Sequence, residues 1–172
     1  MADPSNLLLG QPDGTFAEAA EQAGIVTFDK GRGAALADFN LDGRLDLVLA
    51  KYGAPVQVWR NAGAACAGSC PTTPANWLAL ELSQPGPNVD AIGAVVEVQA
   101  NARTARREVT IGGGHAGGQL GWIHVGLGAA TSAQVRVVWP GQVTGPWLTF
   151  PVNGFFVLDR VTGTARPWQP PA

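Results

Sequence analysis

The chain has 172 residues, of which 46% are hydrophobic and 14% are charged, and a chain of this length can bury a core in one domain or two small ones. The formal net charge of −2 gives no electrostatic basis for binding nucleic acid or an anionic membrane. No apolar run approaches the roughly 18 residues that span a bilayer. The 23 glycines and 13 prolines indicate frequent turns, which favours an all-β protein.

Residues 1–61 are predicted to form a first unit of short strands joined by turns. Residues 7–9 are an apolar run typical of a strand, and residues 11–15 carry proline and Asp-Gly turn signals. Residues 16–23 are expected to form two turns of helix. Three more strands are predicted in this unit, over residues 34–37, 45–49 and 55–60.

A run of oxygen ligands lies between the strands predicted at 34–37 and 45–49. Alternate residues carry carboxylate or amide oxygens, and Gly43 allows the tight turn that follows them. Calcium takes about 6–8 oxygen ligands at about 2.3–2.6 Å, and three carboxylates gathered without a cation would repel one another. The run therefore predicts a Ca²⁺ loop within a β-hairpin, with these ligands: Asp38, Asn40, Asp42, the main-chain carbonyl of Arg44, and Asp46.

The alternative interpretation of this run is a polar β-turn, because Asp, Asn and Gly favour turns for local reasons. An EF-hand is excluded. Position twelve, counted from Asp38, is Leu49, so the bidentate glutamate of that motif is missing, and the flanking segments are too short for its helices.

Residues 62–75 are rich in small residues and are predicted to link two units. Cys66 and Cys70 lie in this linker, which is able to fold into a short disulfide. A zinc site would need a second pair of cysteines or a nearby histidine, and a redox motif would have two residues between the sulfurs, not three. The predicted disulfide indicates an oxidising compartment.

Residues 76–162 are predicted to form a second unit, an antiparallel β-sandwich or barrel, followed by a Pro-rich tail over residues 163–172. Apolar residues alternate with polar ones in runs that are bounded by Gly, Pro and Asn, as is typical of such folds. The alternating apolar positions are Leu78, Leu80, Leu82, Val96, Val98, Val109, Ile111, Ile123, Val125, Leu127, Val135, Val137 and Trp139. Residues 155–158 are a continuous apolar run that forms the last predicted strand.

Two stretches together resemble one known arrangement. Residues 6–61 resemble a single FG-GAP (VCBS, integrin-like propeller) repeat in segments 6–9, 14–16, 38–46 and 58–61. Residues 76–160 resemble the ASPIC/UnbV domain of the cartilage acidic protein family in segments 76–78, 88–94, 107–109, 124–128 and 137–140. The resemblance implies an extracellular or periplasmic calcium-binding β-protein involved in adhesion or matrix contact, without established catalytic chemistry.

The chain departs from that family in two ways. Family members usually carry several repeats that close into a propeller, whereas one is present here, and a lone blade leaves strand edges open. The chain is therefore expected to be the C-terminal piece of a longer protein, or to pair the edge at residues 5–9 or 55–60 with another chain. After residues 139–140 the family usually has Ser-Gly, whereas this chain has Gly141 and Gln142.

Other polar motifs give weaker signals. Asn88 and Asp90 form a second polar loop, which either holds itself by Asx-turn hydrogen bonds or adds oxygens to a second ion. Residues 112–117 match G-x-G-x-x-G, but neither a helix nor an acidic residue about 20 positions on accompanies them, so a glycine loop is favoured. His124 is predicted to be a half-exposed structural residue, and His115 is either a ligand or without a role.

Catalysis is not expected, because no motif places a base beside a serine or cysteine and no glycosidase-type carboxylate pair can be nominated. The sequence predicts a calcium-stabilised module that contacts another protein, or that self-associates by strand pairing into an oligomer or surface filament. It is expected outside the cell, at the cell surface or in the periplasm, although residues 1–5 lack the features of a secretory signal.

Two alternative functions stay open. One is a carbohydrate-binding module, for which neighbouring exposed tryptophans would be the discriminating feature. Trp139 is expected to be buried by the strand alternation, whereas Trp147 and Trp168 lie near Pro-rich segments and are the candidates for exposure. The other alternative is an accessory domain of a larger exported enzyme.

Overall fold

The computed structural model describes residues 4–11, 13–63, 75–113 and 118–170. Within these ranges every regular element is a β-strand, fourteen in all, and no helix is present. The predicted all-β class is confirmed. In the described ranges there is no helix of the length and apolarity needed to cross a membrane. The predicted linker lies mostly outside these ranges, as do Cys66, Cys70 and His115.

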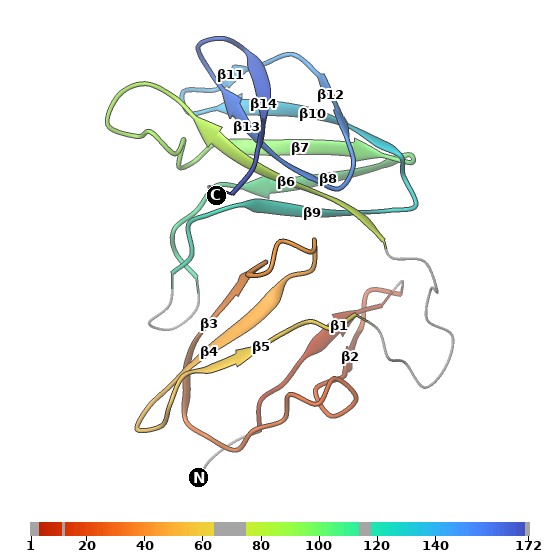
Figure 1. Ribbon diagram of the computed structural model, residues 1–172, viewed down its shortest axis with the longest axis vertical. Helices are drawn as coiled ribbons and strands as arrows, with labels where there is room; N and C mark the ends of the chain where they lie inside the picture. Colours follow the sequence, from red (N-terminus) through yellow and green to blue (C-terminus); the bar gives the residue numbers. More distant parts are fainter. Residues whose placement is uncertain (1–3, 12, 64–74, 114–117, 171–172) are drawn as a thin grey trace.

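The first unit consists of two small antiparallel sheets, seen in the lower part of Figure 1. One pairs β1 (Leu8–Gly10) with β2 (Phe16–Glu18). The other has the order β3-β4-β5 and consists of β3 (Gly31–Ala37), β4 (Asp46–Lys51) and β5 (Gln57–Trp59). The hairpin of β3 and β4 confirms that strands flank the predicted ligand loop, with Ala37 opposite Asp46 at its base.

The helix predicted over residues 16–23 is wrong, because residues 16–18 form β2 and residues 20–24 form turns. The reason lies in the Glu18 carboxylate, which accepts hydrogen bonds from the backbone N–H groups of Leu7 at 2.9 Å and Ala20 at 2.8 Å. These bonds hold the segment beside β1. A polar side chain that binds nearby main chain competes with helix in this way.

The second unit is a sandwich of two sheets, seen in the upper part of Figure 1, and neither sheet closes into a barrel within the described residues. One sheet has the order β11-β10-β7-β8, and β12 also pairs with β10. Its strands are β7 (Val95–Ala100), β8 (Arg103–Glu108), β10 (Ser132–Trp139), β11 (Val143–Thr144) and β12 (Leu148–Pro151). The other has the order β14-β13-β6-β9 and consists of β6 (Asn76–Ser83), β9 (Ile123–Gly128), β13 (Gly154–Asp159) and β14 (Thr164–Trp168).

Three details of the predicted second unit need correction, and the first is that β14 lies within residues 163–172, which were predicted as a Pro-rich tail beyond the sandwich. The pair β6–β13 is parallel, whereas all other strand pairs are antiparallel as predicted. The strand expected to carry Val109 and Ile111 ends earlier, at Glu108. Val109 is still buried, but Ile111 is 53% exposed, because it lies in the loop that follows β8.

The hydrophobic core belongs to the sandwich. Every buried apolar residue of the described chain except Ala20 lies between residues 78 and 158. Alternating side chains from both sheets fill the space between them, as the period-two pattern predicts. The residues that pack together include Leu78, Leu80, Leu82, Val96, Val98, Val125, Leu127, Val135, Val137, Trp139, Phe150 and Phe156.

Candidate metal centre

The loop between β3 and β4 curls around the carboxylate of Asp38. One oxygen of this carboxylate accepts a hydrogen bond from the Asp42 N–H at 3.1 Å, and the other accepts one from the Gly43 N–H at 2.7 Å. The chain can turn this sharply because Leu41 and Gly43 have positive φ angles of 60° and 86°. At 86° a glycine avoids the steric cost that a side chain would bring.

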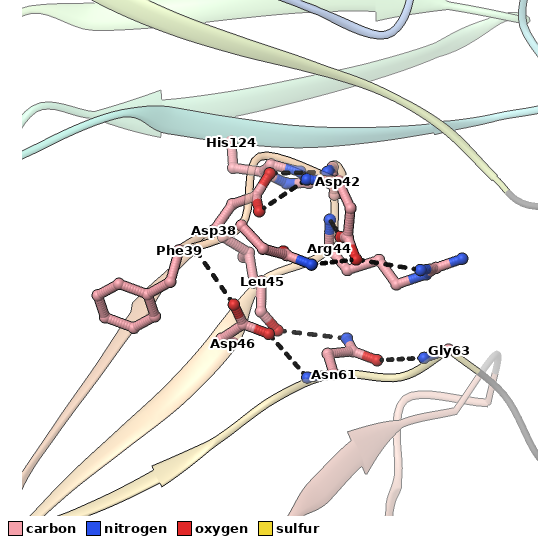
Figure 2. A network of polar contacts seen from close by, with 11 residues as sticks. Asp38, Phe39, Asp42, Arg44, Leu45, Asp46, Asn61, Gly63 and His124 are labelled. Carbon is pink, nitrogen blue, oxygen red and sulfur yellow. Dashed lines mark hydrogen bonds and ion pairs between the residues drawn. The ribbon is translucent and has the colours of Figure 1, made fainter. Parts of the chain in front are cut away.

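Asp42 faces its neighbour Arg44 (Figure 2) and also contacts Asn40. Its carboxylate accepts hydrogen bonds from the Asn40 amide at 2.8 Å and from the Arg44 N–H at 2.9 Å, and the Arg44 guanidinium lies 3.3 Å away. The Asn40 hydrogen bond, followed by that from the Arg44 main chain, holds the pKa of Asp42 below its usual value of 3.8. Asp42 is therefore ionised at neutral pH, as a metal ligand must be.

Asp46 is the buried carboxylate of the group, with 3% of its surface exposed. Its two oxygens accept hydrogen bonds from the Phe39 N–H at 3.1 Å and from the Asn61 N–H at 2.7 Å, and the Asn61 side chain binds the Leu45 carbonyl (Figure 2). These bonds compensate for the burial of the charge. Asp46 thereby ties the first residue of β4 to the residues that follow β3 and β5.

The donor set of the loop fits a hard cation by chemical type, since carboxylate, amide and carbonyl oxygens are the ligands that calcium takes. In this structure the carboxylates of Asp38, Asp42 and Asp46 accept hydrogen bonds from N–H groups of the loop and of residue 61. Among the described residues, no three Asp, Glu, His or Cys side chains are grouped so as to hold a metal ion. A polar turn would make the same hydrogen bonds, so the calcium prediction depends on the donor set.

The tip of the loop is docked against the sandwich. Gly43 is buried, and a Cβ added there would lie 1.9 Å from Nε1 of Trp77, a residue of β6. His124 of β9 places its Nε2 at 2.9 Å from the Gly43 carbonyl oxygen, and Figure 2 shows its ring beside the loop. The Trp77 and His124 rings stack, with centroids 5.7 Å apart and planes 10° apart.

A second contact joins the units at the free edge of β3. The Gln119 side-chain amide accepts a hydrogen bond from the Leu36 N–H at 2.9 Å and donates one to the Leu36 carbonyl at 2.5 Å. One amide group thus occupies the position that a neighbouring strand would take. Sequence reasoning missed Trp77, His124 and Gln119 as partners of the first unit, because contacts between residues 34, 81 and 83 positions apart leave no local pattern.

The comparisons with known proteins concern mainly the second unit. Residues 84–164 match the model of the family described as ASPIC and UnbV. This ASPIC and UnbV region holds strands β7 to β13, and His124 lies within it. The match supports the resemblance seen in residues 76–160. The FG-GAP resemblance of residues 6–61 stays a prediction.

The chain is also similar to Cartilage acidic protein 1 of three species. It is 42% identical to the Homo sapiens protein over 57 residues, which are 33% of this chain and 9% of that protein. Identity to the Xenopus tropicalis protein is 42% over 53 residues, covering 30% of this chain and 8% of the relative. Identity to the Mus musculus protein is 40% over 57 residues, covering 33% and 9%. The matched part is therefore less than a tenth of these relatives.

The second polar loop, at the start of the ASPIC and UnbV region, is closed by Asn88. The side-chain oxygen of Asn88 accepts a hydrogen bond from the Ile92 N–H at 2.8 Å, and its nitrogen donates one to the Ile92 carbonyl at 2.9 Å. Both ends of the amide are therefore used to hold the loop. Asn88 has a structural role in this arrangement, and the second ion near Asp90 stays a prediction.

Five of the six tryptophans, all of which lie in the described ranges, are half-buried. Trp139 is buried as predicted. Trp168 packs against Trp122 with ring centroids 5.0 Å apart, and the Arg136 guanidinium covers Trp147 at 4.5 Å from its centroid. The exposed tryptophans that would mark a carbohydrate-binding module are absent from the described chain.

Proposed function

We propose that the chain is a non-enzymatic extracellular β-module that binds Ca²⁺ at residues 38–46 and makes protein–protein contacts through its first unit. The observation that carries this proposal is the loop itself. It gathers three carboxylates, an amide and a turn glycine where β3 and β4 meet, and its tip is docked on the sandwich. The bound ion would rigidify the β3–β4 hairpin.

The ligands of the ion would be the side chains of Asp38, Asn40, Asp42 and Asp46 with the main-chain carbonyl of Arg44. Binding would replace the Asn40–Asp42 hydrogen bond with bonds from both side chains to the cation. Extracellular modules bind calcium with dissociation constants of about 10⁻⁴–10⁻³ M, so such a loop would be filled outside the cell. The similarity to Cartilage acidic protein 1 supports an extracellular location.

The contact surface would be the first unit. Its strands and connecting segments expose many large apolar side chains, which in a soluble protein mark interaction sites. Phe16 and Tyr52 are each 69% exposed and Val58 is 65% exposed. The others are Leu8, Leu9, Val26, Phe28, Leu36, Phe39, Leu41 and Val56. β5, which carries Val58, is an edge strand, so a second copy could add a strand there and build an oligomer or surface filament.

The calcium proposal is tested by thermal unfolding of the purified chain with CaCl₂, with MgCl₂ and with a chelator. A ligand that binds only the native state raises its stability by about 2.7 kcal/mol at a hundredfold excess over its dissociation constant. Calcium should raise the melting temperature of the wild type but not that of Asp38→Asn, which keeps an oxygen for the Gly43 N–H. An unchanged wild-type melting temperature would refute calcium binding.

Asp159→Asn is the matched control for that experiment. Asp159 closes an exposed turn by accepting hydrogen bonds from the Val161 and Thr162 N–H groups at 2.9 and 2.8 Å, much as Asp38 does in the loop. Asp159→Asn should therefore keep the full calcium response. If this variant also lost it, the response would come from general charge and not from the loop.

Self-association is tested by sedimentation velocity in the presence of calcium. The wild type should form oligomers as its concentration rises, and Val58→Lys on β5 should stay monomeric. Val161→Lys is the control, because Val161 is 72% exposed but lies on the sandwich. A wild-type chain that is monomeric at every concentration would overturn the strand-pairing proposal.

A further inference from the structure

One peptide group of the loop is held from both sides. Its carbonyl belongs to Gly43 and lies 2.9 Å from Nε2 of His124. Its N–H belongs to Arg44 and donates to the Asp42 carboxylate at 2.9 Å. Since a carbonyl oxygen only accepts, Nε2 carries the hydrogen in this contact. A peptide group is planar, so these two bonds together fix its orientation.

His124, which binds the carbonyl of this peptide group, is itself positioned by aromatic packing. Its ring stacks on Trp77, and Trp77 meets the edge of Phe155 with ring centroids 4.9 Å apart. The three residues lie on the neighbouring strands β9, β6 and β13 of one sheet. The absence of a Cβ at Gly43 allows the loop to reach this cluster.

The peptide group lies between two of the proposed ligands. Asp42 precedes it, and the carbonyl of Arg44 belongs to the next peptide group, so a rotation of the held group would release Asp42 from the Arg44 N–H and change the φ angle of Arg44, on which the direction of that carbonyl depends. We propose that His124, backed by Trp77, is a positioning residue for the cation loop, so that the sandwich sets the loop's affinity for calcium. This inference rests on the proposed function.

The coupling must act in both directions, because linkage between two equilibria is reciprocal. A calcium ion that holds the Arg44 carbonyl also favours the orientation in which Gly43 meets His124. Calcium therefore strengthens the contact between the first unit and the sandwich. The ion would fix the direction in which the first unit presents its apolar side chains.

His124→Phe is the sharpest test, since it keeps an aromatic ring to stack on Trp77 but removes the hydrogen-bond donor. If the loop adopts its binding conformation only part of the time, its apparent calcium affinity equals the intrinsic affinity multiplied by the fraction of time spent in that conformation. Loss of one hydrogen bond should weaken calcium binding by about three- to tenfold, measured by titration calorimetry. His124→Gln, which can still donate to the carbonyl, should stay within about twofold of the wild type.

Gln134→Ala is the control, because it removes one side-chain hydrogen bond, to Thr149 at 2.8 Å, on the exposed face of β10. It should bind calcium like the wild type. In the metal-free chains, amide hydrogen exchange at Asp42 and Gly43 should be faster in His124→Phe and unchanged in Gln134→Ala. If the Phe ring does not fit, His124→Ala is compared with His124→Gln, because neither has the imidazole ring that stacks on Trp77 and only glutamine keeps a donor for the Gly43 carbonyl.

Equal calcium affinity in the wild type and in His124→Phe, with equal exchange at Gly43, would overturn the positioning role and leave calcium binding intact. A wild type that binds no calcium would overturn the proposed function, and the positioning role with it. A loss of affinity in His124→Phe that His124→Gln does not restore would assign the effect to the imidazole ring and contradict the hydrogen-bond account.

Discussion

Gly43→Ala should destabilise the protein far more than an alanine at another left-handed glycine. An L-residue at a φ of 86° costs about 1–2 kcal/mol. The new Cβ would also lie 1.9 Å from Nε1, 2.2 Å from Cε2 and 2.4 Å from Cδ1 of Trp77, so the ring or the loop must move. Displacing Trp77 from His124 and Phe155 costs about 0.5–1.5 kcal/mol per aromatic pair. The expected total is about 2–5 kcal/mol.

Gly53→Ala is the control, because Gly53 has a φ of 71°, lies in the turn between β4 and β5, and has nothing within 4 Å of an added Cβ. It should cost only the backbone term of about 1–2 kcal/mol. Both variants are compared by urea unfolding, followed by far-UV circular dichroism and by tryptophan emission, to which Trp77 contributes together with the other five tryptophans. Equal losses of stability in the two variants would refute the docking of the loop on Trp77.

Three further changes test other parts of the structure. Leu80→Ala, at a fully buried position of β6, should lower the free energy of unfolding by about 2–5 kcal/mol in urea titration. Glu97→Gln should lower the free energy of unfolding by about 1 kcal/mol, because the nearly buried Glu97 carboxylate accepts a hydrogen bond from Arg136 Nε at 2.7 Å. The expected loss is small because the Arg136 side chain is partly exposed to solvent. An unchanged free energy of unfolding would contradict a stabilising role for this pair. Hydrogen bonds from the N–H groups of Ala20 and then Leu7 hold the pKa of Glu18 below 4.5. A carboxylate with a lowered folded pKa stabilises the protein above its unfolded pKa and loses this effect as the pH falls through the folded value. Glu18→Gln should therefore show a smaller fall in melting temperature than the wild type when the pH is lowered from about 6 to about 3.

The strands of the sandwich were predictable because each sheet packs one apolar face against the core. The side chains that face the core are apolar at every second position of a strand, as at Leu78, Leu80 and Leu82, and this period of two is visible in the sequence. The pattern does not say which strands become neighbours. The parallel pairing of β6 with β13 was therefore missed. At residues 16–23 a local helix pattern gave the wrong answer, because hydrogen bonds from Leu7 and Ala20 to Glu18 favour a strand.

In the candidate site too, features set by neighbouring residues were predictable from the sequence, whereas contacts between residues far apart in the sequence were not. The donor spacing from Asp38 to Asp46 and the need for glycine at position 43 are local, and the hairpin and its turn agree with them. The docking of the loop is not local. His124 was predicted only as a half-exposed structural residue, and its contact with Gly43 bridges 81 positions. The buried bonds of Asp46 to Phe39 and Asn61 also depend on how three strands pack.

A crystal structure of the chain grown with calcium tests the central claim most directly. The proposal predicts one ion in the β3–β4 loop, with oxygens of Asp38, Asn40, Asp42, Asp46 and the Arg44 carbonyl at about 2.3–2.6 Å from it. It also predicts that His124 still meets the Gly43 carbonyl. A loop that keeps its present hydrogen bonds in millimolar calcium, with Asn40 on Asp42 and no ion among the carboxylates, would contradict the claim.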